Sequence, residues 1–143
     1  MPNYYELLVS ANDAEVLAAI VGERARANPL EAEAADALAD ILLDARMVPH
    51  ERLPADCVGM NSLVSYREEP EGPRRTVAVV HPNEANPAEG RVSVLSPVGR
   101  ALLGRKPGAV IAARVPSGGD LRIHILRVEK DAAPFANNPG AAS

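Results

Sequence analysis

Residues 89–104 read EGRVSVLSPVGRALLG, and this stretch joins a short apolar strand directly to a capped helix. Its valines alternate with polar neighbours, as in a strand with one buried face. Ser96 can accept a hydrogen bond from a first-turn amide, and Pro97 suits the first helical position because it has no amide to satisfy. We therefore expect a helix to begin at Ser96 and Pro97 and to end near Gly104, since glycine favours a left-handed cap.

Length and composition limit the class of protein. The chain has 143 residues, of which 47% are hydrophobic, and this suits one ordinary domain or a small domain with an appendage. No apolar run approaches the roughly 20 residues of a membrane span, and the N-terminus lacks a signal-peptide core. We expect a cytoplasmic protein with no membrane contact. The single cysteine, Cys57, is interpreted as a small apolar side chain and not as a reactive thiol.

Charge is distributed unevenly along the chain. Residues 1–47 hold nine acidic and three basic side chains, a balance of −6, whereas residues 48–143 hold ten acidic and twelve basic side chains, a balance of +2. A balance of +2 is too weak for a nucleic-acid footprint, and three tyrosines with one phenylalanine do not make a base-stacking platform. We expect two parts, and no direct sequence-specific binding of nucleic acid.

Residues 1–47 are predicted to form an antiparallel hairpin of two short helices. Asn12 or Asp13 can cap the first helix, with Glu15 completing a capping box from Asn12. The second helix follows with almost no loop, and its apolar stripe has helical spacing: Leu30, Ala34, Ala37, Leu38, Ile41 and Ala45. At about 1.5 Å per residue, the two helices span roughly 22 and 27 Å.

The predicted tip of this hairpin contains four candidate residues. Asn28 is the expected cap of the second helix, Pro29 its first residue, and Glu31 the acidic partner of the cap. Glu33 completes the acidic tip. Either carboxylate could approach a metal ion, but capping explains Glu31 and ordinary solvation explains Glu33, so we expect no metal site.

Residues 62–131 are predicted to form an antiparallel sheet wrapped on the one helix, which makes the fold class α+β. The strands alternate in two hairpins, over residues 62–68 with 75–80 and over residues 110–115 with 121–128 across Ser117-Gly118-Gly119. The apolar phase changes near Ile125, which predicts a β-bulge. The expected core comprises Val79, Val94, Leu102, Val110, Ile123 and Ile125.

Two further segments complete the predicted organisation. Residues 48–61 contain two prolines and few periodic apolar positions, which is typical of a linker. Residues 132–143 are dominated by Ala, Pro, Asn and Gly, so a disordered tail is expected from Ala132 onward. The chain thus divides into a hairpin (1–47), a linker (48–61), an α+β domain (62–131) and a tail (132–143).

The strand, Ser-Pro, helix and Gly-Arg motif of residues 91–105 resembles the C-terminal domain of the bacterial transcript-cleavage factors of the GreA/GreB type, over about residues 60–130. Within that wider group, the chain is similar to the nucleoside diphosphate kinase regulators through its short hairpin and the sequence LPADCVGMNS at residues 53–62. The resemblance implies an FKBP-like fold for the C-terminal domain.

The same resemblance implies RNA polymerase as the partner, bound at the rim of its secondary channel. Ser96 and Pro97 match the family's docking motif, and the expected polymerase-binding set continues through Val98, Gly99 and Arg100. In the cleavage factors a long coiled coil delivers acidic residues to the active-site metal, whereas the hairpin predicted here is shorter. The resemblance therefore favours binding without cleavage.

We expect no catalytic residue and no cofactor. The three histidines, His50, His81 and His124, are far apart in sequence and lack neighbours at a metal-binding spacing. An FKBP-like fold does not by itself supply prolyl isomerisation, because that activity needs an aromatic-lined pocket and this domain has only Tyr66.

The leading hypothesis is a monomeric, non-enzymatic transcription regulator that binds RNA polymerase at the secondary channel and competes with the cleavage factors. One alternative is a true cleavage factor that lends Glu31 or Glu33 to the polymerase metal. Another is a protein-binding module that controls nucleoside diphosphate kinase through a different protein partner.

Overall fold

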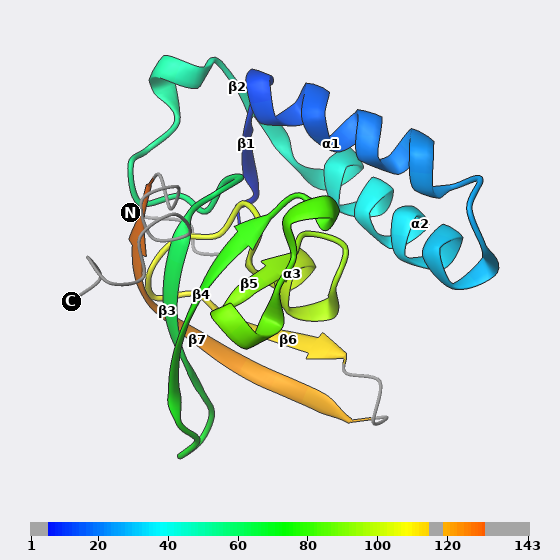
Figure 1. Ribbon diagram of the computed structural model, residues 1–143. Coiled ribbons are helices and arrows are strands. Elements are labelled where there is room, and N and C mark those ends of the chain that lie inside the picture. Colours follow the sequence, from blue (N-terminus) through cyan, green and yellow to red (C-terminus); the bar gives the residue numbers. More distant parts are fainter. Residues whose placement is uncertain (1–5, 115–118, 131–143) are drawn as a thin grey trace.

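The computed structural model describes residues 6–114 and 119–130, and Figure 1 shows a pair of helices beside a curled sheet. The helices are α1 (Ala11–Arg24), α2 (Pro29–Asp44) and α3 (Pro97–Leu102), with 3-10 turns η1 (His50–Arg52), η2 (Pro82–Glu84) and η3 (Pro87–Glu89). The strands are β1 (Leu8–Ser10), β2 (Arg46–Val48), β3 (Leu63–Glu68), β4 (Arg74–Val80), β5 (Arg91–Ser93), β6 (Val110–Arg114) and β7 (Asp120–Glu129). The predicted α+β class is confirmed.

Two of the predicted segments lie wholly or mostly outside the residues that the structure describes. The predicted tail from Ala132 onward and most of the predicted turn at Ser117-Gly118-Gly119 lie outside the described residues. Within the described ranges, no helix is long and apolar enough to cross a membrane.

Helix α1 begins at a different cap from the one predicted. The cap is Ser10, whose Oγ accepts a hydrogen bond from the Asp13 amide at 3.0 Å. The expected cap at Asn12 or Asp13 was therefore wrong by two or three positions. The carboxylate of Asp13 instead accepts a hydrogen bond from the Met60 amide at 3.0 Å, which ties the first turn of α1 to the segment before the sheet.

Helix α2 begins as predicted. Asn28 is its cap, Pro29 is its first residue, and Asn28 Oδ1 accepts a hydrogen bond from the Glu31 amide at 2.9 Å. The Glu31 carboxylate accepts from the side-chain amide of Asn28 at 3.0 Å, instead of from its backbone as in a standard capping box. Helices α1 and α2 contact each other along the hairpin. At about 1.5 Å per residue, their 14 and 16 residues correspond to roughly 21 and 24 Å.

Two short strands close the base of the helical hairpin. Strand β1 precedes α1 and strand β2 follows α2, and they pair in parallel with Leu8 opposite Arg46. The amide of Arg46 also donates to the Leu7 carbonyl at 2.8 Å. This pair has no signal in the sequence, because three-residue strands separated by two helices leave no local periodicity.

The five-stranded sheet has the order β5-β4-β3-β7-β6. The predicted hairpin strands β3 with β4 and β6 with β7 are antiparallel, as expected. Strand β5 pairs with β4 in parallel, so the expectation of a wholly antiparallel sheet was wrong. The chain passes through η2 and η3 between these strands, and this longer crossover returns it to the sheet in the same direction.

The phase change in the last strand is a register shift, as predicted. Ser65 pairs with Arg127 and Tyr66 with Ile125, so Leu126 is the extra residue of a bulge. The bulge moves Val128 to the same buried face as Ile123 and Ile125. Strand β7 therefore supplies core side chains both before and after the bulge.

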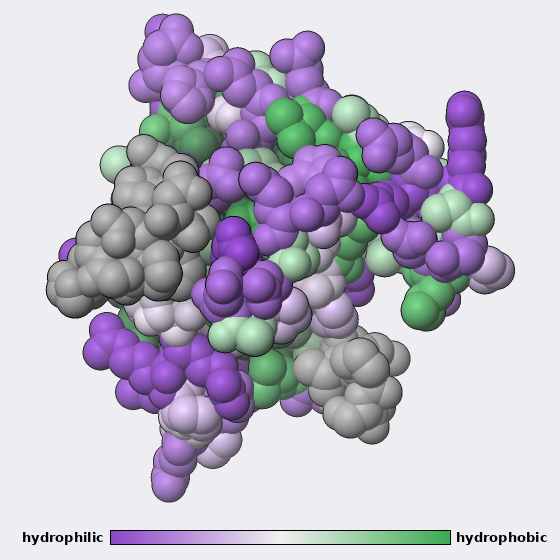
Figure 2. All heavy atoms as spheres, in the orientation of Figure 1, coloured by the Kyte–Doolittle hydropathy of each residue, from purple (hydrophilic) through white to green (hydrophobic). Residues whose placement is uncertain are grey.

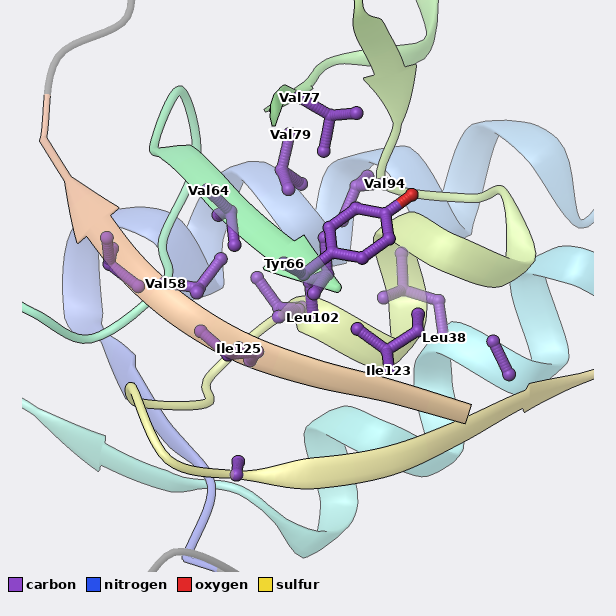
Figure 3. Packing of buried hydrophobic residues seen from close by; sticks show 14 of the residues in the cluster. Leu38, Val58, Val64, Tyr66, Val77, Val79, Val94, Leu102, Ile123 and Ile125 are labelled. Carbon is purple, nitrogen blue, oxygen red and sulfur yellow. The ribbon is translucent and has the colours of Figure 1, made fainter. Parts of the chain in front are cut away.

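The core joins the helical hairpin to the sheet in one cluster (Figure 3). Leu17, Ile20 and Leu38 from the hairpin are fully buried with Val64 and Ile125 of the sheet. Five of the six predicted core residues are buried, and the exception is Val110, which is only half-buried. It pairs with His124 on the outward-facing side of β7, and Ala109 and Ala113 fill the core nearby.

The segment between hairpin and sheet also contributes to the core. Cys57 and Val58 are buried, and Val58 O accepts a hydrogen bond from the Gly104 amide at 2.9 Å. Gly104 follows α3 with a φ of +80°, the left-handed conformation predicted for it. Its carbonyl accepts from the Leu8 amide at 3.2 Å, so one glycine connects α3, the linker and β1.

Candidate docking site

The strand-to-helix corner is held by two serines. Ser96 Oγ accepts a hydrogen bond from the Gly99 amide at 3.1 Å and donates to the Ser93 carbonyl at 2.6 Å. Ser93 Oγ accepts from the Leu95 amide at 2.9 Å. Pro97 occupies the first helical position, as predicted. Side chains therefore satisfy two backbone amides and one backbone carbonyl at this corner, with Pro97 at the start of the helix.

Gly99 allows α3 to pack directly on the strand that precedes it. A Cβ atom built at Gly99 would lie 2.1 Å from the Ser93 carbonyl oxygen and 3.0 Å from the Val94 Cα. These are backbone atoms, which cannot move aside as a flexible side chain can. The close approach of helix and strand thus depends on the absence of a side chain at this position.

Arg100 holds the other end of the corner. Its Nη1 donates a hydrogen bond to the Leu95 carbonyl. Burial lowers the pKa of the Arg100 guanidinium, and the negative charge of Glu33 partly opposes that effect. Leu95 itself is buried. The half-buried Arg100 guanidinium therefore stabilises this corner through the Leu95 carbonyl. Val98 is partly buried and packs against the core.

The hairpin tip engages one of its two candidate carboxylates. Glu31 lies 2.7 Å from Arg24 Nη1 and also accepts the hydrogen bond from Asn28. Arg24 Nη2 donates in turn to the Asn83 side chain in η2 at 2.8 Å. Glu33 is exposed, and its charge acts on Arg100. The structure thus holds Glu31 within the hairpin by an ion pair and leaves Glu33 exposed.

Leu30, the first residue of the apolar stripe predicted for the second helix, lies at the outer end of the hairpin. Figure 2 shows a mostly hydrophilic surface over the helical hairpin, with an apolar patch at its outer end. Leu30 is 79% exposed, whereas Ala35 and Leu38 of the same helix are buried. The stripe therefore contacts the core only from the second turn of α2 onward.

A groove that no sequence motif predicts lies beside α3. It has a volume of about 220 Å³ and is lined by Leu7, Ile41, Pro97, Arg100, Ala101, Arg105, Ala112 and Ala113. These residues come from the start of the chain, α2, α3, the turn after it and β6. No single segment contributes a recognisable motif, so only the tertiary fold assembles this groove.

Cys57, His81 and His124 have structural partners. Cys57 is buried, its Sγ is 3.4 Å from the Leu8 carbonyl oxygen, and burial raises the pKa of its thiol. His81 Nδ1 accepts from the Asn83 amide at 3.0 Å, and His124 lies 3.9 Å from Glu69. Across residues 6–114 and 119–130, no three His, Cys, Asp or Glu side chains gather as metal ligands would.

Comparison with known proteins identifies the C-terminal part. Residues 53–130 match the family described as "Transcription elongation factor, GreA/GreB, C-term". A solved structure of a prokaryotic transcription elongation factor GreA/GreB from Nitrosomonas europaea superposes with a TM-score of 0.68 at 32% identity. The superposition covers 87% of this chain and 98% of that one. The likeness therefore extends to the helical hairpin as well as to the sheet.

Two curated relatives give the same result. The Escherichia coli (strain K12) "Regulator of nucleoside diphosphate kinase" is 37% identical over 95 residues, which cover 66% of this chain and 70% of that protein. "Transcription elongation factor GreA" of Clostridium kluyveri is 37% identical over 81 residues, which cover 57% of this chain and 51% of that protein. The chain thus matches about half the length of the GreA relative. From these matches together, the chain belongs to the GreA/GreB transcription elongation factor family, in which its relatives include the regulators of nucleoside diphosphate kinase.

Proposed function

We propose that this protein is a monomeric, non-enzymatic transcription regulator that binds RNA polymerase at the rim of the secondary channel. In this proposal the C-terminal domain is the anchor and the acidic hairpin occupies the channel mouth, in competition with the cleavage factors. The observation that carries it is the Ser96–Pro97 corner, which has internal hydrogen bonds on both sides and belongs to the segment that matches the family.

The finer description of the fold belongs to the same proposal. We assign the sheet and α3 to the FKBP-like arrangement that the family resemblance implies, with the hairpin (1–47) and linker (48–61) preceding the domain (62–131). In this proposal the protein works in the cytoplasm, together with a bacterial RNA polymerase. The docking set is Ser96, Pro97, Val98, Gly99 and Arg100.

Two features of the hairpin support binding without cleavage. The helices have 14 and 16 residues, or roughly 21 and 24 Å, which is short for reaching a buried metal through a channel. Glu31 is occupied by Arg24 and Asn28, and releasing it would break an ion pair and a hydrogen bond. The hairpin, at −6 over residues 1–47, would act through occupancy and its negative field.

A cleavage assay on backtracked polymerase complexes tests the proposal, run beside a pull-down with core polymerase. We expect binding, no shortening of the RNA, and slower cleavage when a GreA-type factor is added at a fixed concentration. Rapid shortening by this protein alone would instead support a cleavage factor that uses the exposed Glu33. Failure to bind core polymerase would refute the proposal.

The relationship to the Escherichia coli regulator favours a second candidate function. At 37% identity over 95 residues, that relative is named for control of nucleoside diphosphate kinase. The test is to measure nucleoside diphosphate kinase activity with purified kinase, with and without this protein and in the absence of polymerase. A change in kinase activity would show that this protein acts directly on the kinase. No change would favour an effect on the kinase through transcription.

A further inference from the structure

An apolar groove lies at the base of the helical hairpin, where the start of α1 and the end of α2 meet the paired strands β1 and β2 (Figure 1). This groove, which we call the basal groove, has a volume of about 200 Å³. Its lining consists of apolar side chains: Val9, Ala14, Ala18, Leu42, Ala45 and Met47. Three of these are alanines, so small side chains leave the space between the two helices open.

Exposed apolar side chains continue the surface outside the basal groove. Met47 is 63% exposed although it lines the groove, and Leu43, the residue after Leu42 in α2, is 83% exposed. At about 200 Å³, the groove is smaller than the roughly 300–1,000 Å³ of typical small-molecule sites. Covering apolar surface is favourable, so the groove suits one apolar side chain of a partner protein, with Leu43 and Met47 in contact around it.

A stripe of three carboxylates follows the exposed side of α2. Asp36, Asp40 and Asp44 recur at intervals of four residues, which places them on one face of the helix, and all three are exposed. Within the described residues, none of the three takes part in an ion pair. At about 100° per residue around the helix, Leu43 lies between Leu42 in the groove and this acidic stripe.

The acidic stripe lowers the stability of α2. Like charges four residues apart in a helix repel each other. The last turn of α2 carries the partial negative charge of the helix dipole, yet it contains Asp44 and no basic residue. This charge pattern has no structural benefit within the described part of the chain, which points to a positively charged partner.

We propose that the basal groove receives an apolar side chain of RNA polymerase, carried on a segment with basic residues beside it. This inference rests on the proposed function, in which the C-terminal domain is anchored at the rim of the channel. The base of the hairpin is joined to that domain through the common core, so it would lie at the rim as well. The basic residues of the partner would then pair with the acidic stripe, and its apolar side chain would be covered by Leu42 and Met47.

Filling the basal groove tests the apolar contact. Ala18→Leu places a larger side chain in the groove, whereas Ala19→Leu adds the same atoms to the next residue of α1, which is exposed and outside the groove lining. Leucine and alanine are both good helix formers, so both variants should fold. We expect Ala18→Leu to weaken binding to core polymerase by at least about tenfold and Ala19→Leu to stay within about threefold of wild type. If circular dichroism shows that Ala18→Leu is unfolded, Met47→Gln takes its place with the same expectation, because Met47 is exposed.

Neutralising the acidic stripe tests the charge. The stripe variant combines Asp36→Asn, Asp40→Asn and Asp44→Asn. The control variant removes three exposed carboxylates elsewhere, through Glu51→Gln, Glu71→Gln and Glu84→Gln. At low salt we expect the stripe variant to bind core polymerase at least about tenfold more weakly than the control, and its affinity to depend less on salt. Its thermal stability should be equal to wild type or higher, because the repulsion within α2 is relieved. A loss of affinity without a loss of stability cannot come from a damaged fold.

The outcomes separate this inference from the proposed function. Wild-type affinity in the folded groove variant, or equal affinities for the stripe and control variants, would overturn the inference, and the proposed function would stand if the wild-type chain binds polymerase. Self-association of the wild-type chain in sedimentation, abolished by Ala18→Leu, would assign the groove to a second copy of the chain and overturn the inference. No binding of polymerase by the wild-type chain would refute both.

Discussion

Arg24 Nη1 lies 2.7 Å from the Glu31 carboxylate, across the turn that joins α1 to α2. The pair neutralises the tip carboxylate that also accepts a hydrogen bond from the side chain of the helix cap, Asn28, so the hairpin already uses the charge that a metal ion would require. Arg24 extends the connection to Asn83 of η2. The tip of the hairpin is therefore linked to the sheet domain through a chain of side-chain hydrogen bonds.

Loss of the tip carboxylates should leave competition for polymerase nearly unchanged. In Glu31→Ala and Glu33→Ala, we expect the concentration that halves cleavage by a GreA-type factor to stay within about threefold of wild type, since occupancy needs no metal ligand. The length of RNA in a stalled, backtracked complex is the second measurement. RNA that shortens rapidly with wild type and not with these variants would identify a cleavage factor.

Replacing Ser96 or Pro97 with alanine should weaken polymerase binding. Both changes also remove part of a helix start, which costs on the order of 1 kcal/mol of stability. Asn28→Ala is the matched control, because it removes the cap of α2 at a similar cost away from the docking set. We expect all three to lower thermal stability and only the first two to lower affinity. Retained affinity in Ser96→Ala and Pro97→Ala would disprove the docking role.

Gly99→Ala should destabilise the protein by about 1–3 kcal/mol, because the new Cβ would meet the Ser93 carbonyl and the backbone must shift. Gly22→Ala is the control. Gly22 lies within α1 with nothing within 4 Å of its Cβ position, so alanine there should stabilise the helix by about 0.5–1 kcal/mol. Denaturant unfolding of both variants gives the two signs, and an unchanged midpoint for Gly99→Ala would contradict the close approach.

A fragment of residues 53–130 should fold without the helical hairpin. It retains the sheet, α3 and the buried Val58, and these side chains can close a core. Its stability should be lower than that of the full chain, because Leu17, Ile20 and Leu38 no longer cover that core. Thermal unfolding monitored by circular dichroism tests this. A gradual, non-cooperative transition together with strong binding of an apolar-surface dye would show that the hairpin is required.

The Cys57 thiol should react slowly in the native protein. Burial raises its pKa above the ordinary 9.0, so at pH 8 the reactive thiolate is rarer than in the unfolded chain, and access is closed as well. The same shift means that the folded state holds a proton that the unfolded state releases, so this group's contribution to stability is full below about pH 9 and is lost as pH rises further. A colorimetric thiol reagent, with and without denaturant, measures the rate. Equal rates in both conditions would contradict the buried position.

Local signals in the sequence determined the elements whose hydrogen bonds lie within a few residues. Ser96 and Asn28 are caps because their side chains satisfy amides three positions away. The bulge at Leu126 could be predicted because one extra residue in a strand shifts the alternation of its apolar side chains. The family followed from residues 91–105 and 53–62, because their motifs are contiguous in sequence.

Contacts between distant segments were decided only by the tertiary structure. Ser10, and not Asn12 or Asp13, caps α1, and the Asp13 carboxylate instead accepts a hydrogen bond from Met60, 47 residues further along the chain. Strand β5 is parallel to β4 because the crossover through η2 and η3 sets its direction, and no residue within β5 encodes that. The groove beside Pro97 takes its lining from five separate segments. Local sequence determines torsion angles and the hydrogen bonds between near neighbours. Strand direction, hydrogen bonds between distant residues and grooves lined by several segments depend on how the elements pack around one core.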